Sequence, residues 1–333
     1  MRTELIIGES AFDIPAAEWD ELAARGITAT PFQTHAYQRA WWTHLQPPDT
    51  TLMTVVTRDV DGRLLGIGCF YNLGGELHFY GCIEESDYLD LIVAPEHAEA
   101  VWRATWDCLE QVVEPRWSAL DLCNIPADSP TLTLLPAIAQ PANAPFTEIL
   151  LDVCPVITLP ESEEAYLESL DSKQRRELTR KMRRAEGAGV ETTIVGPNSD
   201  LAAEIDSFLD LLQKSTFEKR DWLNEGRRAL FHEVGRAALA AGTLQLMFTS
   251  LENRRAAALF NFDYNGRIWV YNSGLDPAAF AALSPGVVLT AEAINEAIRL
   301  GRRTFDFMRG DEEYKYRFGA ADTKIYRLHI ERA

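Results

Sequence analysis

The sequence predicts an α/β protein of two domains, each with a mixed, largely antiparallel sheet flanked by helices. The chain has 333 residues, which is long for one hydrophobic core, because domains usually hold about 100–200 residues. Strand-like and helix-like segments alternate along the chain. In addition, one pattern of strands and turns in the first half recurs in the second half.

The first half is expected to begin its sheet with a three-stranded antiparallel meander. The dipeptides Asp61-Gly62 and Gly74-Gly75 separate the strand-like runs and are typical of hairpin turns. Pro95 suits the first turn of the helix that follows. The expected elements are a helix at 32–45, strands at 51–57, 64–71 and 76–81, a helix at 95–113 and a strand at 117–123.

The repeat of the strand and turn pattern can be seen in the sequence itself. Residues 51–81 align with residues 243–273 without gaps, and six positions are identical. The strand and turn rhythm also matches, with Asn265-Gly266 at the second hairpin. We interpret the chain as two copies of one fold. The identical pairs are Thr51/Thr243, Leu52/Leu244, Thr57/Thr249, Arg63/Arg255, Phe70/Phe262 and Gly74/Gly266.

The domain boundary is predicted in a proline-rich stretch, residues 124–160, because proline interrupts helices and favours extended backbone. The expected domains are 1–150 and 155–333. The second domain is expected to contain a basic helical segment at 161–187, a strand at 190–195, helices at 200–214 and 226–241, the 243–273 meander, a helix at 287–300, and strands at 303–308 and 323–331.

Charge is distributed unevenly. The net charge is −18, yet residues 1–160 hold 23 acids and 7 arginines without a lysine, while residues 161–333 hold 27 acids and 25 bases. The acidic first half should repel nucleic acid and anionic membranes. Any phosphate-bearing ligand is therefore expected in the second half.

Composition also bears on location and metals. The N-terminal residues lack the continuous apolar region of a signal peptide, and no run of about 18 apolar residues predicts a membrane span. The five cysteines are odd in number and have no C-x-x-C spacing, so we expect buried thiols in a reducing cytoplasm. The six histidines form no metal-binding motif, so no metal is expected.

The loop before the helix at 287–300 is the strongest candidate for a ligand site. Ser284, Pro285 and Gly286 lead into the helix after a strand. Such a junction presents free backbone N–H groups and the positive end of the helix dipole, which suit a pyrophosphate. The alternative is an ordinary loop that starts a helix.

Several neighbouring segments carry a resemblance to a known family. They are Y-N-S-G-L-D-P-A (271–278), L-S-P-G (283–286), G-R-R-T-F-D-F-M-R-G (301–310), Y-K-Y-R-F-G-A (314–320) and the basic pattern at 170–184. In this order they resemble the CelD/BioF-like bacterial acetyltransferases of the GNAT superfamily. A more distant likeness is to Fem-type peptidyltransferases, which also have tandem GNAT domains.

The resemblance implies transfer of an acyl group from acetyl-coenzyme A or another acyl-coenzyme A to an amine of a small-molecule, sugar or envelope-precursor acceptor. Coenzyme A would then dock at Ser284, Pro285, Gly286, Val287 and Val288. The usual Q/R-x-x-G-x-G/A signature of the superfamily is missing, and residues 283–288 occupy its place.

Three residues are candidates for the chemistry, because amine attack on a thioester needs a base, a donor to the carbonyl and an acid for the thiolate. Asp306 lies between two phenylalanines on a strand and should point away from them, either into the cleft or as a solvated or capping carboxylate. Tyr271 ends the meander and is either the acid or a half-buried sheet residue. Lys315 follows the last core strand.

Arg309 and Arg317 are expected to bind the donor together with Lys315. If the segment is extended, Lys315 and Arg317 share a face and can contact phosphate or carboxylate. The alternative is a salt-bridged surface loop with Asp311, Glu312 and Glu313.

Two charged segments are expected to bind partners. The bases at 173–184 are expected to form salt bridges with the acidic domain, or else to bind an anionic substrate. Asp87, Tyr88 and Asp90 can bind a cationic amine, with an acidic surface loop as the alternative. The first domain should therefore bind the acceptor.

Two rival functions remain. One is an aminoacyl-tRNA-dependent transferase. This hypothesis alone involves nucleic acid, and the overall acidity of the chain disfavours it. The other is a non-catalytic binding protein of polysaccharide or envelope biosynthesis. The sequence does not determine the acceptor, the acyl chain or the oligomeric state.

Overall fold

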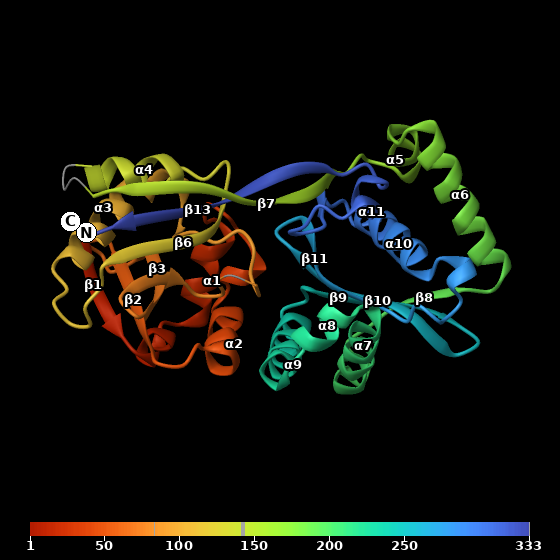
Figure 1. Ribbon diagram of the computed structural model, residues 1–333, viewed down its shortest axis with the longest axis horizontal. Helices are drawn as coiled ribbons and strands as arrows, with labels where there is room; N and C mark the ends of the chain where they lie inside the picture. Colours follow the sequence, from red (N-terminus) through yellow and green to blue (C-terminus); the bar gives the residue numbers. More distant parts are fainter. Residues whose placement is uncertain (83, 141–143, 333) are drawn as a thin grey trace. The chain divides into compact units, whose positions relative to one another are not determined.

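The computed structural model describes residues 1–82, 84–140 and 144–332. Its contacts divide the chain into two compact units (Figure 1). Unit 1 holds Met1–Val153 together with the segment that begins at Thr323, and unit 2 holds Cys154–Asp322. No helix among the described residues is both long and apolar enough to cross a membrane.

Unit 1 is a mixed sheet with helices on both faces. The strand order is β1-β2-β3-β4-β6-β13, and β5 pairs with β3. Trp41 of α2 packs on Tyr71, whereas Trp102 of α3 packs on Phe70, so the two helices cover opposite faces of β3. The elements are β1 (Arg2–Ile7), α1 (Ala16–Ala24), α2 (His35–Leu45), β2 (Thr50–Arg58), β3 (Leu64–Leu73), β4 (Glu76–Phe79), β5 (Ile92–Val93), α3 (Ala98–Glu110), β6 (Ala119–Pro126) and α4 (Thr131–Ala139).

Unit 2 is built in the same way. The strand order is β7-β12-β11-β10-β9-β8. Helix α10 packs on β9 and β10 from one side and α6 packs on α10, while α7 and α9 lie on the other side of the sheet (Figure 1). The elements are the end of β7 (Phe146–Thr158), α5 (Glu163–Ser169), α6 (Ser172–Gly187), β8 (Glu191–Ile194), α7 (Leu201–Ser215), α8 (Phe217–Trp222), α9 (Glu225–Ala240), β9 (Leu244–Leu251), β10 (Arg254–Tyr264), β11 (Arg267–Leu275), α10 (Pro285–Arg299), β12 (Thr304–Asp306) and α11 (Glu313–Tyr316). Most of β7 and nearly all of β13 (Ala321–Glu331) lie in unit 1.

The two units repeat one element order. In each unit an antiparallel meander leads into a helix and then into a strand parallel to the third meander strand. These parallel pairs are β4 with β6 in unit 1 and β11 with β12 in unit 2. The meanders lie where the repeat predicted them, which confirms the α/β architecture of two similar halves.

The last strand of the chain differs from expectation. β13 was expected to belong to the second domain, but it pairs antiparallel with β6, so the residues from Thr323 onward belong to unit 1. β7 in turn runs into unit 2, where its end pairs with β12. Each unit therefore completes its sheet with a strand from the other half of the sequence, a pairing that local patterns do not reveal.

Several other expectations need correction. β1, α1 and α8 were missed, and the proline-rich stretch contains α4 and the whole of β7 rather than only linker. The basic segment forms two helices, because Leu170 is extended and Asp171 caps a new helix by accepting from two backbone N–H groups. Cys82 and Cys123 form a disulfide, so not all cysteines are thiols.

Candidate functional site

The parallel pair β11 and β12 is short, and it opens into a cavity. The two strands pair only from Arg267 and Thr304 to Trp269 and Asp306. β11 continues to Leu275, whereas the chain leaves β12 after Asp306. Backbone groups beyond that point do not pair across the two strands, so the strands separate and leave space between them.

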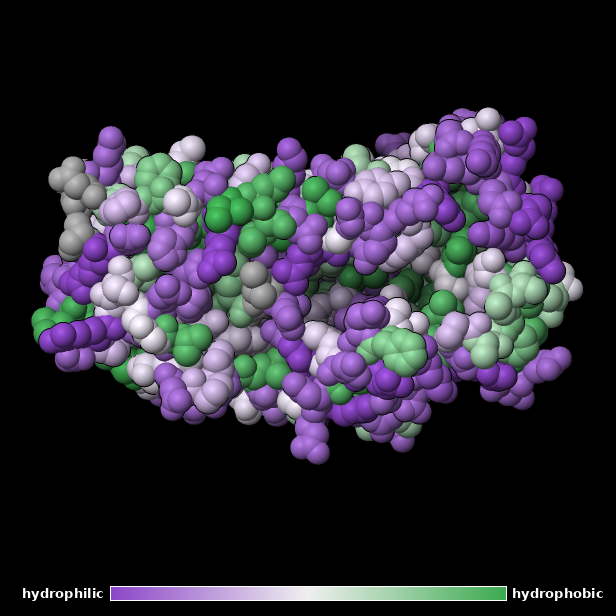
Figure 2. Space-filling model, in the orientation of Figure 1, coloured by the Kyte–Doolittle hydropathy of each residue, from purple (hydrophilic) through white to green (hydrophobic). Residues whose placement is uncertain are grey.

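A cavity of about 400 Å³ occupies this space. Its volume falls in the usual range for small-molecule sites. The lining is mostly apolar, and hydrophobic side chains are visible in a hollow of the surface over unit 2 (Figure 2). The main lining residues are Leu259, Val270, Ser273 and Leu275 from β10 and β11, Asp276 just after β11, Ala281, Ser284, Pro285, Gly286, Val287, Leu289 and Thr290 around the start of α10, and Phe305, Phe307, Tyr314 and Phe318 from β12 and beyond.

The N-terminus of α10 forms one wall of the cavity. Ser284 precedes the helix in a left-handed conformation and Pro285 is its first residue. The next two residues, Gly286 and Val287, carry first-turn N–H groups that have no partner within a helix. This wall can bind an anion through backbone donors.

The residues expected to bind the donor fall into two groups. Ser284, Pro285, Gly286 and Val287 line the cavity together, while Val288 is buried beside them and is not part of the wall. Arg309 is half-buried and Arg317 is exposed. Arg317 donates to Glu313 at 2.8 Å, and among the described residues that line the cavity neither arginine is found.

Asp306 lies on the side of β12 away from the cavity. Its neighbours Phe305 and Phe307 line the cavity, and alternation along a strand turns Asp306 to the other face. The carboxylate is fully buried, accepts from the Met308 N–H at 2.8 Å, and lies 3.4 Å from Arg267 Nη1. It therefore points neither into the cavity nor toward solvent.

Tyr271 is the extra residue of a β-bulge. The neighbouring residues Phe260 and Asn261 of β10 pair with Asn272 and Val270, so Tyr271 has no partner position in the register. Its ring packs 5.3 Å from those of Phe231 and Phe262, on the α9 side of the sheet. Val270 faces the cavity instead.

Lys315 is buried within its own loop. The segment is the short helix α11 rather than extended backbone, so the expected shared face with Arg317 is wrong. Lys315 Nζ donates to the carbonyl oxygens of Met308, Arg309 and Gly310 at 2.9–3.1 Å and pairs with Glu312 at 2.8 Å. The ammonium therefore holds the turn between β12 and α11. Its pair with Glu312, like that of Arg317 with Glu313, belongs to the salt-bridged loop that was the alternative.

A lysine that the sequence did not single out lies close behind the cavity wall. Lys219 of α8 donates from Nζ to Ser273 O at 2.7 Å and to Ser273 Oγ at 3.1 Å. Ser273 lines the cavity. Burial lowers the pKa of Lys219 to about 8, and nearby Lys315 lowers it further while Glu312 opposes the shift. A lysine with this pKa can exchange protons near neutral pH.

The acidic run of unit 1 is buried rather than an exposed loop. Asp87, Tyr88 and Asp90 all have less than a tenth of their surface exposed. Asp90 accepts hydrogen bonds from Ser129 Oγ and Thr131 Oγ1 and from the Leu91 N–H. Burial raises the pKa of Asp90 to about 6. Asp90 therefore ties its loop to the start of α4.

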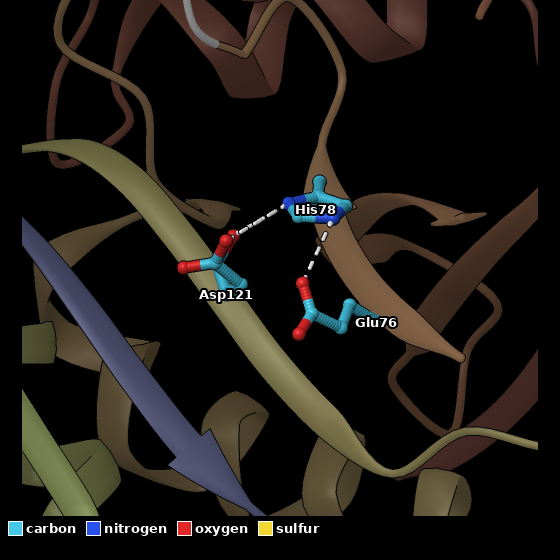
Figure 3. Close-up of side chains that lie close together, drawn as sticks. All are labelled: Glu76, His78 and Asp121. Atoms are coloured by element: carbon cyan, nitrogen blue, oxygen red, sulfur yellow. Dashed lines mark hydrogen bonds and ion pairs between the residues drawn. The ribbon is translucent and has the colours of Figure 1, made fainter. Parts of the chain in front are cut away.

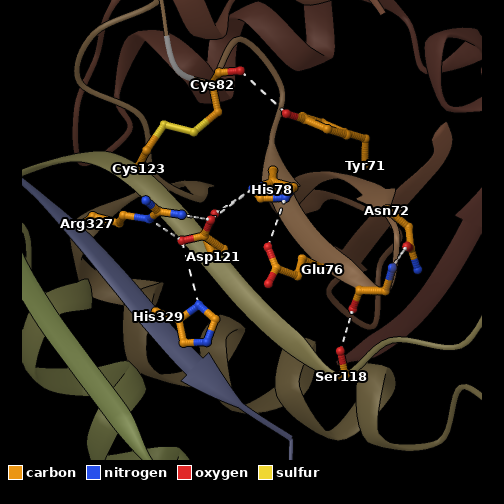
Figure 4. Close-up of polar contacts among 11 residues, drawn as sticks. Tyr71, Asn72, Glu76, His78, Cys82, Ser118, Asp121, Cys123, Arg327 and His329 are labelled. Atoms are coloured by element: carbon orange, nitrogen blue, oxygen red, sulfur yellow. Dashed lines mark hydrogen bonds and ion pairs between the residues drawn. A yellow bond between two sulfur atoms is a disulfide. The ribbon is translucent and has the colours of Figure 1, made fainter. Parts of the chain in front are cut away.

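Unit 1 also carries a network of charged side chains that the sequence did not indicate. Glu76 and His78 project from β4 toward Asp121 of β6 (Figure 3). His78 Nδ1 lies 3.1 Å from Asp121 O, and Nε2 lies 3.7 Å from Glu76 Oε2. Arg327 and His329 of β13 approach Asp121 from the other side (Figure 4).

This network could in principle hold a metal ion, because the three ligand atoms of Glu76, His78 and Asp121 lie within 4.8 Å of one another. However, Arg327 donates to both oxygens of Asp121 and neutralises its charge. The imidazole also presents a different nitrogen to each carboxylate (Figure 3). We therefore interpret the network as a polar link between β4, β6 and β13.

The basic helix α6 lies beside the loop that leads into α10. It contacts the 3₁₀ turn Ala281–Leu283, whose first residue lines the cavity. Leu178 and Ala185 are buried, whereas hydrophilic side chains cover the outer surface of the helix (Figure 2). Arg180 and Lys181 pair with Glu177 of the same helix. Apart from this group, the exposed basic residues of α6 are Lys173, Arg175, Arg176, Arg183 and Arg184.

The fold of unit 2 is similar to that of GNAT acetyltransferase domains. Residues 172–316 match the family model described as an acetyltransferase (GNAT) domain. Unit 2 therefore carries a GNAT domain, and unit 1 repeats its element order. No curated protein matches the chain.

Solved structures share the fold along nearly the whole chain. A crystal structure of FemX is 12% identical with a TM-score of 0.69, covering 98% of this chain and 97% of that one. The structure of L-PGS from Bacillus licheniformis is 11% identical with a TM-score of 0.60, covering 98% and 93%. A conserved protein of unknown function from Bacteroides thetaiotaomicron is 14% identical with a TM-score of 0.60, covering 96% and 98%. At these identities the likeness shows the fold alone.

Proposed function

We propose that this chain transfers an acyl group from acyl-coenzyme A to an amine, with the donor held in the cavity of unit 2. The observation that carries the proposal is the position of the cavity, between the separating strands β11 and β12 and against the first turn of α10. A thioester arm can enter between the strands while its pyrophosphate accepts from the N–H groups of Gly286 and Val287.

The lining supports an uncharged arm rather than a charged substrate. Phe305, Phe307, Leu259 and Val270 surround the inner part of the cavity. Burying a charge there without a partner would cost several kcal/mol. The pantetheine arm and the acyl chain carry no charge, so they enter this lining without that cost.

The basic face of α6 supports the same orientation. Its contact with Ala281–Leu283 brings arginines near the side of the cavity that the α10 N-terminus forms. Exposed guanidinium groups pair readily with phosphate. We propose that the nucleotide phosphates of the donor extend toward Arg183 and Arg184.

For the acceptor we keep a small-molecule, sugar or envelope-precursor amine, bound with the help of unit 1. Asp87 and Tyr88 remain candidate contacts, while the carboxylate of Asp90 already accepts three hydrogen bonds.

A second candidate is an aminoacyl-tRNA-dependent transferase. The fold is similar to that of FemX over 98% of this chain, and α6 offers positive charge to a polyanion. The net charge of −18 opposes binding of a large nucleic acid.

Native mass spectrometry of the full chain with coenzyme A, acetyl-coenzyme A, octanoyl-coenzyme A and aminoacyl-tRNA tests the proposal. We expect one acyl-coenzyme A per chain and no tRNA complex. Binding of tRNA alone would favour the second candidate, and binding of neither donor would favour a non-catalytic binding protein.

A further inference from the structure

Lys219 and Ser273 form a pair that joins the cavity to a lysine outside it. Ser273 lies near the end of β11 and faces the cavity. Lys219 is half-buried on α8 and reaches the oxygens of Ser273 from behind the wall. Gly274 permits the close approach of α7, the helix that precedes α8, because a Cβ there would lie 2.7 Å from the Leu212 backbone nitrogen.

The contacts of Lys219 suit both of its protonation states. As an ammonium it donates to Ser273 O and to Ser273 Oγ. As a neutral amine it can still donate to Ser273 O, and its lone pair can then accept the hydroxyl proton of Ser273. Neither state leaves a buried polar atom without its partner, which is what a group that repeatedly gains and loses a proton requires.

The charges around Lys219 favour this exchange. Its hydrogen bonds in the described chain go to uncharged oxygens, because Glu312 is paired with Lys315 at 2.8 Å. Burial is the largest cause of its lowered pKa; Lys315 adds to the effect and Glu312 reduces it. By contrast, Lys315 donates to three carbonyl groups and pairs with a carboxylate.

We infer that Lys219 takes up the proton that the acceptor amine must lose, and that Ser273 Oγ passes this proton from the cavity to the lysine. The inference rests on the proposed function. It assigns Ser273 to contact with the reacting amine, and it assigns Lys219 to act through Ser273.

The step balances as follows. The acceptor ammonium gives one proton to Ser273 Oγ, whose own proton moves to the neutral amine of Lys219. The freed lone pair attacks the thioester carbonyl, forming the C–N bond. When the C–S bond breaks, the second proton of the nitrogen passes to the departing sulfur. Lys219 then returns its proton to solvent, so the products are an amide, coenzyme A thiol and one proton.

Two small nucleophiles test the step without knowledge of the natural acceptor. Ethylamine is protonated at neutral pH and needs a base, whereas hydroxylamine is uncharged and does not. Acetyl-coenzyme A turnover by the full chain is followed as thiol release with each nucleophile, across pH and after subtraction of the uncatalysed rate. The variants are Lys219→Met, Lys219→Arg and Ser273→Ala, with exposed Lys214→Met of α7 as the matched control.

General-base catalysis typically contributes about 10²–10⁴-fold, so each of the three variants should lower the ethylamine rate at least tenfold. Their hydroxylamine rates and acetyl-coenzyme A affinity should stay close to those of the wild-type protein and Lys214→Met. The wild-type ethylamine rate should rise with pH through about 8, the pKa of Lys219. Equal losses with both nucleophiles, or no loss with ethylamine, would overturn the inference.

A separate measurement distinguishes this failure from failure of the proposed function. The pH dependence of amine labelling at Lys219, read by peptide mass spectrometry, should have its midpoint near 8. A labelling midpoint near pH 10.4, the value of a free lysine, would contradict the assignment even if the donor binds. If acetyl-coenzyme A neither binds nor reacts, the proposed function falls and the inference falls with it.

Discussion

Arg267 Nη1 lies 3.4 Å from Asp306 Oδ2, across the parallel pair β11 and β12. Asp306 is fully buried on the face of β12 that turns away from Phe305, Phe307 and the cavity. The pair therefore belongs to the sheet that holds the cavity open rather than to its lining.

Asp306→Asn should therefore destabilise the fold more than it affects the reaction. Removing the charge leaves Arg267 without its carboxylate partner, which should cost roughly 2 kcal/mol. Chemical denaturation and acetyl-coenzyme A titration of the same variant measure the two effects. Normal stability with at least tenfold lower turnover would instead assign Asp306 to the reaction.

Lys315→Met should also act through stability. The ammonium makes three hydrogen bonds to carbonyl groups between β12 and α11, and its loss leaves those acceptors unpaired. We expect a loss of about 3 kcal/mol in the free energy of unfolding. The matched control is Arg317→Met, which removes an exposed pair with Glu313 and should cost less than about 1 kcal/mol. If Lys315→Met is as stable as the control but inactive, Lys315 contacts the reactants.

Asp90 should make stability depend on pH. Its pKa rises from 3.8 to about 6 on folding, so the folded state keeps its proton where the unfolded state has lost it. The resulting stabilisation is fully present below about pH 3.8 and is lost as pH rises through about 6. The difference amounts to roughly 3 kcal/mol. Asp90→Asn should flatten the unfolding free energy measured between these pH values, and an unchanged slope would contradict the buried, protonated state.

The arginines of α6 should contribute to donor affinity. Arg183→Ala combined with Arg184→Ala should weaken acetyl-coenzyme A binding, and high salt should shrink the difference from the wild-type protein. Exposed Arg236→Ala on α9 is the control, because α9 covers the other face of the sheet. Unchanged donor affinity in the double variant, together with lower stability at low salt, would favour the salt bridges with the acidic unit that the sequence predicts.

The sequence allowed prediction of those parts of the fold that depend on local turns and periodicity. Asp61-Gly62, Gly74-Gly75 and Asn265-Gly266 located the hairpins, and Pro285 with Gly286 located the start of α10 and one wall of the cavity. Local patterns could not show that β7 and β13 complete distant sheets, nor that Cys82 meets Cys123, because these contacts join segments far apart in the chain.

The same limit applies to the reactive groups. Lys219 lies in a short polar helix of the kind usually exposed to solvent, and its hydrogen bond to Ser273 joins residues 54 positions apart. Lys315 and Asp306 were recognisable as unusual polar residues, but their partners decide their orientation. The sequence placed Asp306 in the cleft or at the surface and Lys315 in a ligand-binding or salt-bridged loop, whereas the structure buries both and holds each by the turn or the strand next to it.

The most direct test of the proposed donor site is calorimetric titration of acetyl-coenzyme A into two tryptophan variants. Ala281 and Ala282 are adjacent and exposed in the same 3₁₀ turn, but only Ala281 belongs to the described lining of the cavity. We predict that Ala281→Trp blocks entry and weakens binding at least tenfold, about 1.4 kcal/mol, while Ala282→Trp binds as the wild-type protein does. Equal affinity in both variants, with a folded wild-type protein that binds the donor, would show that the donor lies elsewhere.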